Sequence, residues 1–396
     1  MPRFRGITRT LPLPVLYHLS LSSAVLMNKN GGICLNRLHK ARFFLFVVLA
    51  VALCMVCSPA AAVAGGPIII DHTSTHLNEV PLNAIENAKS TLHIAYGHTS
   101  HGSQVTTGMT GLTTFAGAPY GGSTYAWNNG GSGGALDLHD YAMSGDLGNP
   151  DRTSWADRTR TYLNANPDVN VIMWSWCGQA DTTAANIDLY LSLMNQLETE
   201  YPDVMFVYMT GHLTGTGEDG NLNVRNEQIR AYARTNNKIL YDFADIESYD
   251  PDGLVNYMQL NADDGCNYDG GNWATTWQNS HNEGVDWYSC SAAHTQPLNA
   301  NQKAYAAWYM WARITGWDGT ADQPVALQGQ SGIPTDPDSD GLYEDLNANA
   351  RTDFADVNLF FEQMEWVAEN EPVSLFDFNG NGRIDFADIT ALFEEI

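Results

Sequence analysis

Apolar and polar residues follow two periods along residues 65–320. Short apolar runs predict buried strands, and longer segments with apolar residues at every third or fourth position predict amphipathic helices. The predicted strands are Thr91–Tyr96, Val169–Trp174, Val204–Met209 and Lys238–Asp242, and the predicted helices are Pro81–Lys89, Ser154–Asn164, Thr183–Glu200, Val224–Thr235 and Asn299–Thr315. Strands that alternate with helices of this length indicate an α/β domain, with a parallel sheet covered by helices on both faces.

The predicted strands end in polar residues. In chain order the residues that follow them are His98 and Ser100, then Cys177 and Gln179, then His212, and finally Asp245. Ligands of parallel sheets bind outside the carboxyl ends of the strands, so four successive polar ends predict one shared site. The stretch 108–134 is rich in glycine and threonine and predicts a long loop beside that site.

The charge of the chain is unevenly distributed. The 396 residues carry a formal charge of −26, yet Met1–Ala64 holds seven Lys and Arg and no acidic residue. The strongly acidic remainder argues against nucleic acid as a partner. Basic residues, the apolar run Phe43–Val56 and the small residues Ala62–Ala64 predict a secretory signal peptide cut after Ala64. The run is shorter than the ~20 residues of a membrane span, and an uncleaved anchor is the alternative. We therefore expect a secreted or cell-surface-attached protein with no membrane span after cleavage.

Three cysteines follow Ala64. In an oxidising compartment Cys266 and Cys290 are expected to form a disulfide, which leaves Cys177 free. The segment 263–287 between them is rich in glycine, asparagine and tryptophan. Its tryptophans, Trp273, Trp277 and Trp287, either form platforms for sugar rings or anchor the segment.

Residues 336–396 hold 16 acidic and two basic side chains and contain a repeat at a spacing of 32 residues. Oxygen donors at positions 1, 3, 5, 9 and 12, with the carbonyl of position 7, match the EF-hand calcium loop. The first repeat supplies Asp345, Asn347, Asn349, the carbonyl of Arg351, Asp353 and Asp356, and the second supplies Asp377, Asn379, Asn381, the carbonyl of Arg383, Asp385 and Asp388. An apolar-periodic helix is predicted after each loop.

Position 6 differs between the repeats. The second loop has the usual glycine, Gly382, but the first has Ala350, so we expect a strained turn and weaker calcium binding there. Three further acidic residues precede the first loop, Asp336, Asp338 and Asp340, and are candidate ligands of another calcium ion. So acidic a segment has little apolar content, and we expect it to need calcium to fold.

The duplicated loop–helix pattern resembles a type I dockerin. The resemblance implies calcium-dependent binding to a cohesin domain of a scaffold, which carries mostly polysaccharide-degrading enzymes. It also implies partner contacts at Phe354 and Ala355 and, in the second repeat, at Phe386 and Ala387. Because the two repeats are nearly identical there, docking in two orientations is expected. Residues 321–335 lack charge clusters and periodicity and predict a linker between residues 65–320 and this module.

Four places in the α/β domain carry a second resemblance. They are the strand followed by Gly97–Gly102, the glycine-containing segment 144–150, the strand after Pro167 that ends at Gly178–Asp181, and Ser291–His294 before the last helix. Together they resemble the SGNH/GDSL hydrolases, a flavodoxin-like family of esterases, lipases and carbohydrate deacetylases. The chain departs from the pattern at several positions. Histidine replaces the first-block aspartate at His98, the serine lies one place late, Ala180 replaces asparagine, and Ser291 replaces the aspartate before the histidine.

The resemblance implies an acyl-transfer site. Ser100 is the expected nucleophile, with Thr99 and Ser103 in reserve, and His294 is the expected base. The expected oxyanion donors are Gln179 and the backbone of Gly145 or Gly148. Either Asp286 or a backbone carbonyl is expected to orient His294.

Two other assignments at this edge stay open. Cys177 is either a nucleophile or a buried thiol. The histidines His98, His101, His212 and His294 permit a metal site, although no cofactor is expected in the α/β domain and calcium is expected in the dockerin-like module.

The sequence therefore predicts a secreted hydrolase that cleaves esters of carbohydrates, for example by deacetylation, and that docks to a scaffold. One alternative is an inactive domain that binds glycan or a cell surface, which Ala180 and Ser291 favour. Another is a glycosidase, which needs paired carboxylates among Asp181, Asp245 and Asp286.

Overall fold

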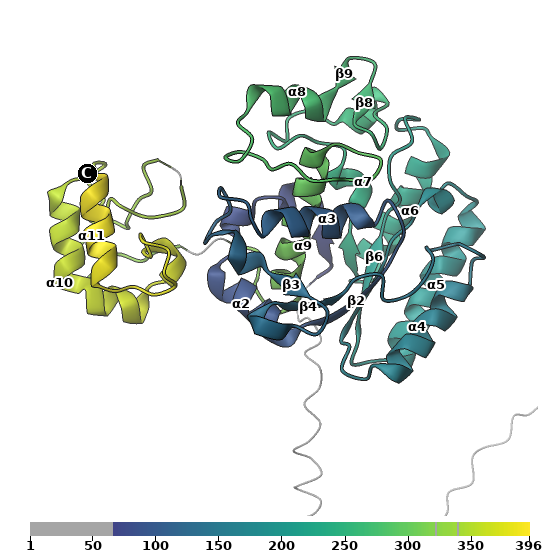
Figure 1. The fold of residues 1–396 in the computed structure, drawn as a ribbon, viewed down its shortest axis with the longest axis horizontal. Helices are drawn as coiled ribbons and strands as arrows, with labels where there is room; N and C mark the ends of the chain where they lie inside the picture. Colours follow the sequence, from purple (N-terminus) through teal and green to yellow (C-terminus); the bar gives the residue numbers. More distant parts are fainter. Residues whose placement is uncertain (1–65, 321–322, 339) are drawn as a thin grey trace, which may run out of the picture. The chain divides into compact units, whose positions relative to one another are not determined.

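The computed structural model describes residues 66–320, 323–338 and 340–396. The predicted signal peptide lies outside the described residues. Residues 66–320 form an α/β domain around a seven-stranded sheet in which all pairings are parallel (Figure 1). Its strands are β1 (Ile68–Ile70), β2 (His93–Gly97), β3 (Trp127–Asn128), β4 (Leu136–His139), β5 (Val171–Trp174), β6 (Met205–Met209) and β7 (Ile239–Tyr241). The prediction of an α/β domain with a parallel sheet is confirmed.

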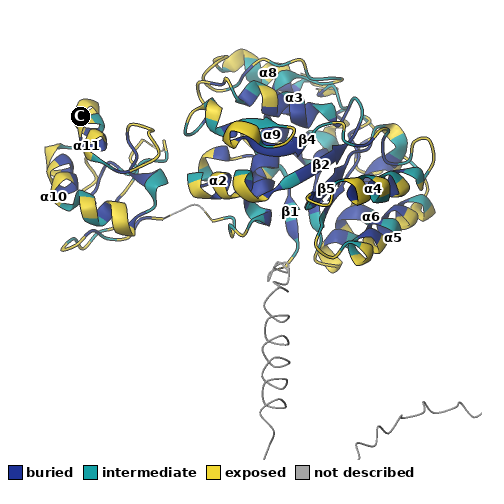
Figure 2. Cartoon of the chain, turned by 60° about the horizontal axis from the view of Figure 1, so that its bottom comes forward, coloured by how far each residue is buried: buried dark blue, intermediate teal, exposed yellow. Residues whose placement is uncertain are grey.

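Helices cover both faces of the sheet. One layer contains α2 (Leu82–Thr91), α3 (Ser103–Leu112) and α9 (Pro297–Ile314), and the other contains α4 (Ser154–Ala165), α5 (Ala184–Glu200) and α6 (Asn221–Thr235) (Figure 1). The short helices α7 (Phe243–Ile246) and α8 (Trp273–Ser280) and the antiparallel hairpin β8 (Asn267–Tyr268) and β9 (Gly271–Asn272) complete the domain. Figure 2 shows the central strands in the dark blue of buried residues.

The order of the strands creates a crevice in the middle of the sheet. The spatial order is β1-β7-β6-β5-β2-β4-β3, so the chain leaves β2 toward β4 on one side and then crosses to β5 on the other. Ligands bind at such a reversal because the two outgoing connections diverge. Gly97 of β2 is in register with Trp174 of β5, so the segments that follow these two residues start side by side.

The first predicted loop contains a helix that the pattern did not reveal. Residues 108–112 of the stretch 108–134 belong to α3, which packs closely on α9. A Cβ atom at Gly108 would collide with the backbone carbonyl of Ala300, so glycine is what allows this approach. Together with α2, β1 and α7, α3 buries 15 of the 18 residues of α9. The rest of the stretch is a loop apart from β3 and two short 3-10 turns, Gly122–Tyr125 and Ser132–Gly134.

The C-terminal module (residues 336–396) has its own apolar core. Its helices are α10 (Phe354–Asn370) and α11 (Phe386–Glu395), and each starts with a capping box, Asp353 with Asp356 and Asp385 with Asp388. Residues 323–335, which were predicted as a linker, pack on this module. Leu327 is 1% exposed and lies in the same core, and the backbone N–H of Val325 donates to the Glu371 carboxylate.

Among the helices of the described residues, none is both long and apolar enough to cross a lipid bilayer.

Candidate functional site

A thiol, an imidazole and a carboxylate form a line at the crevice between β2 and β5. The Sγ atom of Cys177 lies 3.0 Å from Nδ1 of His101, and Nε2 of His101 lies 2.8 Å from Oδ2 of Asp264. His101 follows β2, Cys177 follows β5, and Asp264 comes from the segment between α7 and α8. A nucleophile, a base and a group that orients the base need these contacts.

The turn after β2 positions His101. Only five residues separate the end of β2 from the start of α3 at Ser103, so the chain has to turn sharply after β2. A Cβ atom at Gly102 would collide with the Oγ of Ser175 and with Cβ of His98, so glycine permits the turn. Ser103 Oγ donates to the carbonyl of Ser100 over 2.6 Å and holds the start of the helix.

Burial and hydrogen bonding set the charge of the imidazole and the carboxylate. His101 is 6% exposed, and this burial lowers its pKa below the usual 6.5, although the hydrogen bond to Asp264 acts in the opposite direction. Burial acts to raise the pKa of Asp264, but the hydrogen bond from His101 and the nearby His212 outweigh it and lower that pKa. At neutral pH the imidazole is therefore neutral and able to accept a proton, and the carboxylate is ionised.

Three imidazoles stack at this site. The ring of His101 lies parallel to that of His212, with centroids 3.8 Å apart, and to that of His294, with centroids 4.4 Å apart. His294 has a φ of 65°, in the left-handed region that non-glycine residues seldom adopt. Backbone strain of this kind is concentrated at functional sites.

The predicted pair of Ser100 and His294 does not form a hydrogen bond among the described residues. Ser100 Oγ lies 3.9 Å from Cys177 Sγ, and the His294 ring stacks on His101 instead. Of the reserve nucleophiles, Thr99 donates its hydroxyl to Asp146 over 2.5 Å, and Ser103 donates to the Ser100 carbonyl. Of the three hydroxyl groups, only that of Ser100 therefore lies beside Cys177.

The predicted oxyanion donors lie at the rim of the same crevice. Gln179 accepts from the Cys177 backbone N–H over 2.9 Å, and its amide nitrogen lies 3.4 Å from Asp146. Gly148 packs against Gln179, because a Cβ there would come within 3.0 Å of the Gln179 Cβ, whereas Gly145 lies against the Arg158 guanidinium. The Gln179 side chain thus shapes the turn that carries Cys177, and Gly148 borders it.

Two of the polar residues that follow the strands, His98 and Asp245, lie outside the line of Cys177, His101 and Asp264. His98 is buried, and its nitrogens lie 2.7 Å from Asp140 and 2.9 Å from the Thr99 carbonyl. Asp245 lies 2.5 Å from Nδ1 of His72. Both are paired with partners outside the line of Cys177, His101 and Asp264.

The carboxylates named for a glycosidase each bind a different partner. Asp181 accepts from the Asn221 side chain over 2.6 Å, Asp245 pairs with His72, and Asp286 accepts from the Asn282 backbone over 2.7 Å. Asp286 therefore has a local role in its own loop, and the carboxylate beside the stacked histidines is Asp264.

One group of residues at the site could hold a transition metal. One ligand atom each of His101, Asp264 and His294 lie within 4.8 Å of one another. Two imidazoles and a carboxylate are a ligand set that zinc accepts. The predicted metal alternative named His101 and His294 but also His98, which is paired with Asp140 instead.

The predicted disulfide between Cys266 and Cys290 is wrong, since both thiols are free. Cys266 is buried with its sulfur 3.3 Å from Thr295 Oγ1, and burial raises its pKa to about 12. Cys290 is half-buried beside Asn301, and burial raises its pKa to about 11. The two sulfurs lie in different packing environments.

The tryptophans of the segment 263–287 anchor it. Trp273 is 1% exposed and packs in a small apolar cluster, and Trp277 and Trp287 pack against that cluster. The indole of Trp277 also donates to Asp252 over 3.2 Å. Trp273 is therefore not an exposed platform for sugar.

A buried ion pair lies beneath the histidines. Lys303 Nζ lies 2.7 Å from Glu247, and both side chains are fully buried. Glu247 also accepts from the backbone of Leu213, beside His212. Lys303 donates to Gln104, whose amide donates to the carbonyl of Ala293, beside His294. The pair therefore connects the loops that carry His212 and His294.

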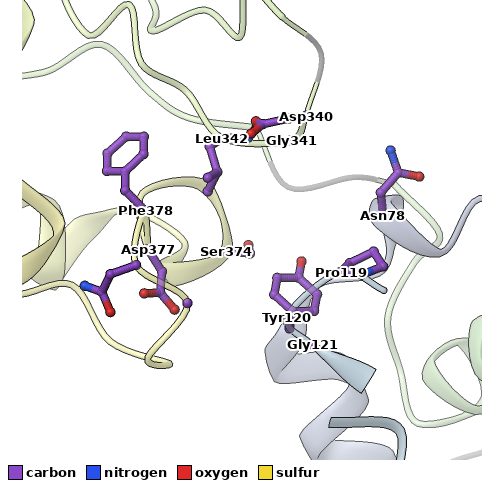
Figure 3. Close-up of a pocket in the computed structure, with 12 residues that line it drawn as sticks. Asn78, Pro119, Tyr120, Gly121, Asp340, Gly341, Leu342, Ser374, Asp377 and Phe378 are labelled. Carbon is purple, nitrogen blue, oxygen red and sulfur yellow. The ribbon is translucent and has the colours of Figure 1, made fainter. Parts of the chain in front are cut away.

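The two predicted calcium loops have the same internal hydrogen bonds. The carboxylate of position 1 accepts from the backbone N–H groups of positions 5 and 6, at 2.9 and 2.8 Å for Asp345 and at 3.0 and 2.7 Å for Asp377. Figure 3 shows the Asp377 carboxylate and the neighbouring Phe378 ring pointing in different directions. Ala350 has a φ of 63°, which confirms the expected strained turn in the first loop.

The residues present fit a calcium ion. Asp345 and Asp356 of the first loop and Asp388 of the second are fully buried, and burial raises the pKa of Asp356 and Asp388. Burial of ionised carboxylates is costly unless a cation compensates it.

Comparison with protein-family models, with curated proteins and with solved structures finds no match for this chain.

Proposed function

We propose that the α/β domain is a hydrolase that transfers the acyl group of an ester to water, with Cys177 as the nucleophile. One observation carries the proposal, namely the continuous line from the thiol of Cys177 through both nitrogens of His101 to the carboxylate of Asp264. Ser100, the nucleophile expected from the sequence, lies beside this line and is not the nucleophile in this proposal.

The steps follow from the contacts. Nδ1 of His101 takes the thiol proton, and the sulfur attacks the ester carbonyl. The tetrahedral intermediate expels the alcohol, which receives that proton, and a thioester on Cys177 remains. Water, deprotonated by His101, then attacks the thioester, the C–S bond breaks to release the acid, and the Cys177 sulfur takes the proton back from His101. Asp264 holds the imidazole in the required tautomer and stabilises its charged form. Ser100 Oγ, 3.9 Å from the sulfur, is the nearest hydroxyl to the developing oxyanion.

The proposed substrate is an acylated carbohydrate. Supporting observations are the strand order of the five inner strands, β4-β2-β5-β6-β7, which corresponds to the flavodoxin-like order 2-1-3-4-5, and the location of the cysteine at its switch point. The resemblance to SGNH/GDSL hydrolases and the dockerin-like module point to the same class of substrate. We propose that the protein is secreted and acts in polysaccharide degradation.

A test compares thiol alkylation with zinc chelation on the full chain. We expect turnover of p-nitrophenyl acetate and of acetylated xylan, abolished by iodoacetamide and unaffected by 1,10-phenanthroline, which leaves calcium in place. A folded chain that turns over neither ester would contradict the proposal. It would favour the glycan-binding alternative, to be measured on glycan arrays.

The second candidate is a zinc hydrolase at the same place. The convergence of His101, Asp264 and His294 within 4.8 Å favours it, since three protein ligands leave a position for a water nucleophile. Inhibition by 1,10-phenanthroline together with resistance to iodoacetamide would select this candidate.

For the C-terminal module we propose calcium-dependent docking to a cohesin domain through an exposed phenylalanine surface. Phe354, Phe361, Phe386 and Phe393 are 53–64% exposed. Phe354 packs edge-on against Phe393 at 6.2 Å, and Phe361 packs edge-on against Phe386 at 6.1 Å. Phe354 and Phe386 occupy equivalent positions of the two repeats, as do Phe361 and Phe393, so exchange of the repeats converts one pair into the other. This internal two-fold symmetry of the surface supports docking in two orientations.

Substitution of both Phe354 and Phe386 by alanine is expected to weaken binding of a type I cohesin domain by about 100-fold or more, as loss of aromatic hot spots does. Each single substitution is expected to cost less than about ten-fold, because one orientation remains intact. Titration calorimetry of the full chain measures both values, and calcium uptake is the control. Equal losses in the single and double variants would contradict the two-orientation mode.

A further inference from the structure

The described residues 336–338 and 340–344, immediately before the first calcium loop, have the spacing and hydrogen bonds of a third loop of the same kind. The spacing Asp336, Asp338, Asp340 places carboxylates at positions 1, 3 and 5, and Gly341 occupies position 6 with a φ of 98°. Asp336 accepts from the backbone of Asp340 over 3.3 Å and of Gly341 over 2.9 Å. The two predicted calcium loops show the same pattern at their first positions. Figure 3 includes Asp340, Gly341 and Leu342 of this loop.

Glu344, at position 9, completes the cluster. One carboxylate oxygen each of Asp336, Asp338, Asp340 and Glu344 lie within 4.8 Å of one another. Glu344 differs from the three aspartates because its side chain is buried. Its side chain is 5% exposed, and its Oε2 atom is buried without a hydrogen-bond partner among the described residues. A buried carboxylate oxygen without a partner is costly, and a cation would supply the missing partner.

The negative charge of the cluster also favours a bound cation. The carboxylates of Asp336, Asp338 and Asp340 lie close to that of Glu344, so four negative groups are concentrated in one place. The only basic residues of the segment 336–396 are Arg351 and Arg383. They pair with Asp353 at 2.8 Å and with Asp385 at 2.6 Å, so neither neutralises the cluster.

We infer that Asp336, Asp338, Asp340 and Glu344 bind a third calcium ion, with the backbone carbonyl of Leu342 at position 7. Four carboxylates and a carbonyl are the all-oxygen set that calcium prefers, and this donor number exceeds what a magnesium ion usually takes from protein. The inference goes beyond the two loops of the proposed dockerin-like module.

The site would fix the segment that enters the C-terminal module. Thr335, directly before Asp336, donates its hydroxyl to Asp345 over 2.7 Å, and their backbones exchange hydrogen bonds at 3.1 and 3.2 Å. Asp345 is position 1 of the first calcium loop. An ion in the third loop would therefore hold the C-terminal end of residues 323–335 in place. That end lies beside Asp345, where the first calcium loop begins.

The test counts calcium ions on the full chain. The chain is stripped with chelator, dialysed against calcium and analysed for bound metal, for the wild type, for the double variant with Asp338→Asn and Glu344→Gln, and for Glu369→Gln. Glu369 is an exposed acid of the same module outside the three loops and serves as the matched control. We expect three ions for the wild type and control and two for the double variant.

Each other outcome has one meaning. Two ions in all three proteins would overturn the third site and leave the two-loop proposal intact, and no ion in any would overturn both. Three ions in the double variant would overturn the assignment of ligands. Asp338→Asn alone changes an exposed residue and cannot unfold the core. It should weaken the affinity of one ion at least about ten-fold and leave two unchanged, and unchanged affinity of all three would overturn the site.

Discussion

Replacement of Cys177 by alanine is expected to lower kcat/KM for an acyl ester by roughly 10⁴- to 10⁶-fold, because removal of the nucleophile removes the covalent route. Steady-state kinetics with p-nitrophenyl acetate measure the effect. The matched control is Cys290→Ser, which changes another free, half-buried thiol and should leave kcat/KM unchanged. Full activity in Cys177→Ala with loss in Ser100→Ala would assign the nucleophile to Ser100.

The pH profile tests the rest of the line. The pKa of His101 lies below its usual 6.5, so the neutral base is available at neutral pH and kcat/KM falls only below pH 6.5. Asp264→Asn removes the negatively charged partner whose hydrogen bond raises this pKa, so the acid limb should move to still lower pH while kcat falls. An acid limb that moves upward in this variant would contradict the assigned contact.

Replacement of Lys303 by methionine is expected to destabilise the α/β domain by about 3–5 kcal/mol, because Glu247 would remain buried without its partner. Burial lowers the pKa of Lys303, and the contacts to Glu247 act in the opposite direction. Urea unfolding followed by tryptophan fluorescence measures the change. The second substitution Glu247→Gln should recover much of the loss, since it removes the uncompensated charge.

The control for this prediction is an ion pair at the surface, in which the carboxylate is exposed. Lys89 lies 2.6 Å from Glu86, whose side chain is 53% exposed, so Lys89→Met should cost less than about 1 kcal/mol. An equal and small cost for Lys303→Met would show that the buried pair contributes little. Because the pair also connects the loops of His212 and His294, Lys303→Met should reduce activity even where the chain remains folded.

The hydrophobic pattern predicted most of the sheet and missed its shortest parts. Where the hydrophobic periodicity is clear, the predicted bounds of strands and helices differ from the observed ones by a few residues. An example is the predicted helix Ser154–Asn164, which corresponds to α4 at Ser154–Ala165. β3 has only two residues, too few to show a period, and α3 contains Gly108 and Gly111, which weaken the helical signal. Tertiary contact with α9 decides the structure of that segment.

The sequence located the candidate site, and the structure gives its residues hydrogen-bond partners other than the expected ones. His101 and Ser100 are adjacent, and the sharp turn imposed by Gly102 decides which of them reaches Cys177. Asp264 is 163 residues from His101 in a segment without periodicity, so no spacing connects the two. Ser291 stands where the resemblance implies an aspartate, and the carboxylate that contacts His101 comes from a different loop.

The burial of α9 has a consequence for synthesis of the chain. The helix is covered on nearly all sides, and its partner α3 ends at Leu112, about 200 residues before α9 ends at Ile314. At roughly 5–20 residues per second, the ribosome needs about 10–40 s to cover this distance. For that time the α3 surface has no partner, and the domain closes only when almost all of it has been made.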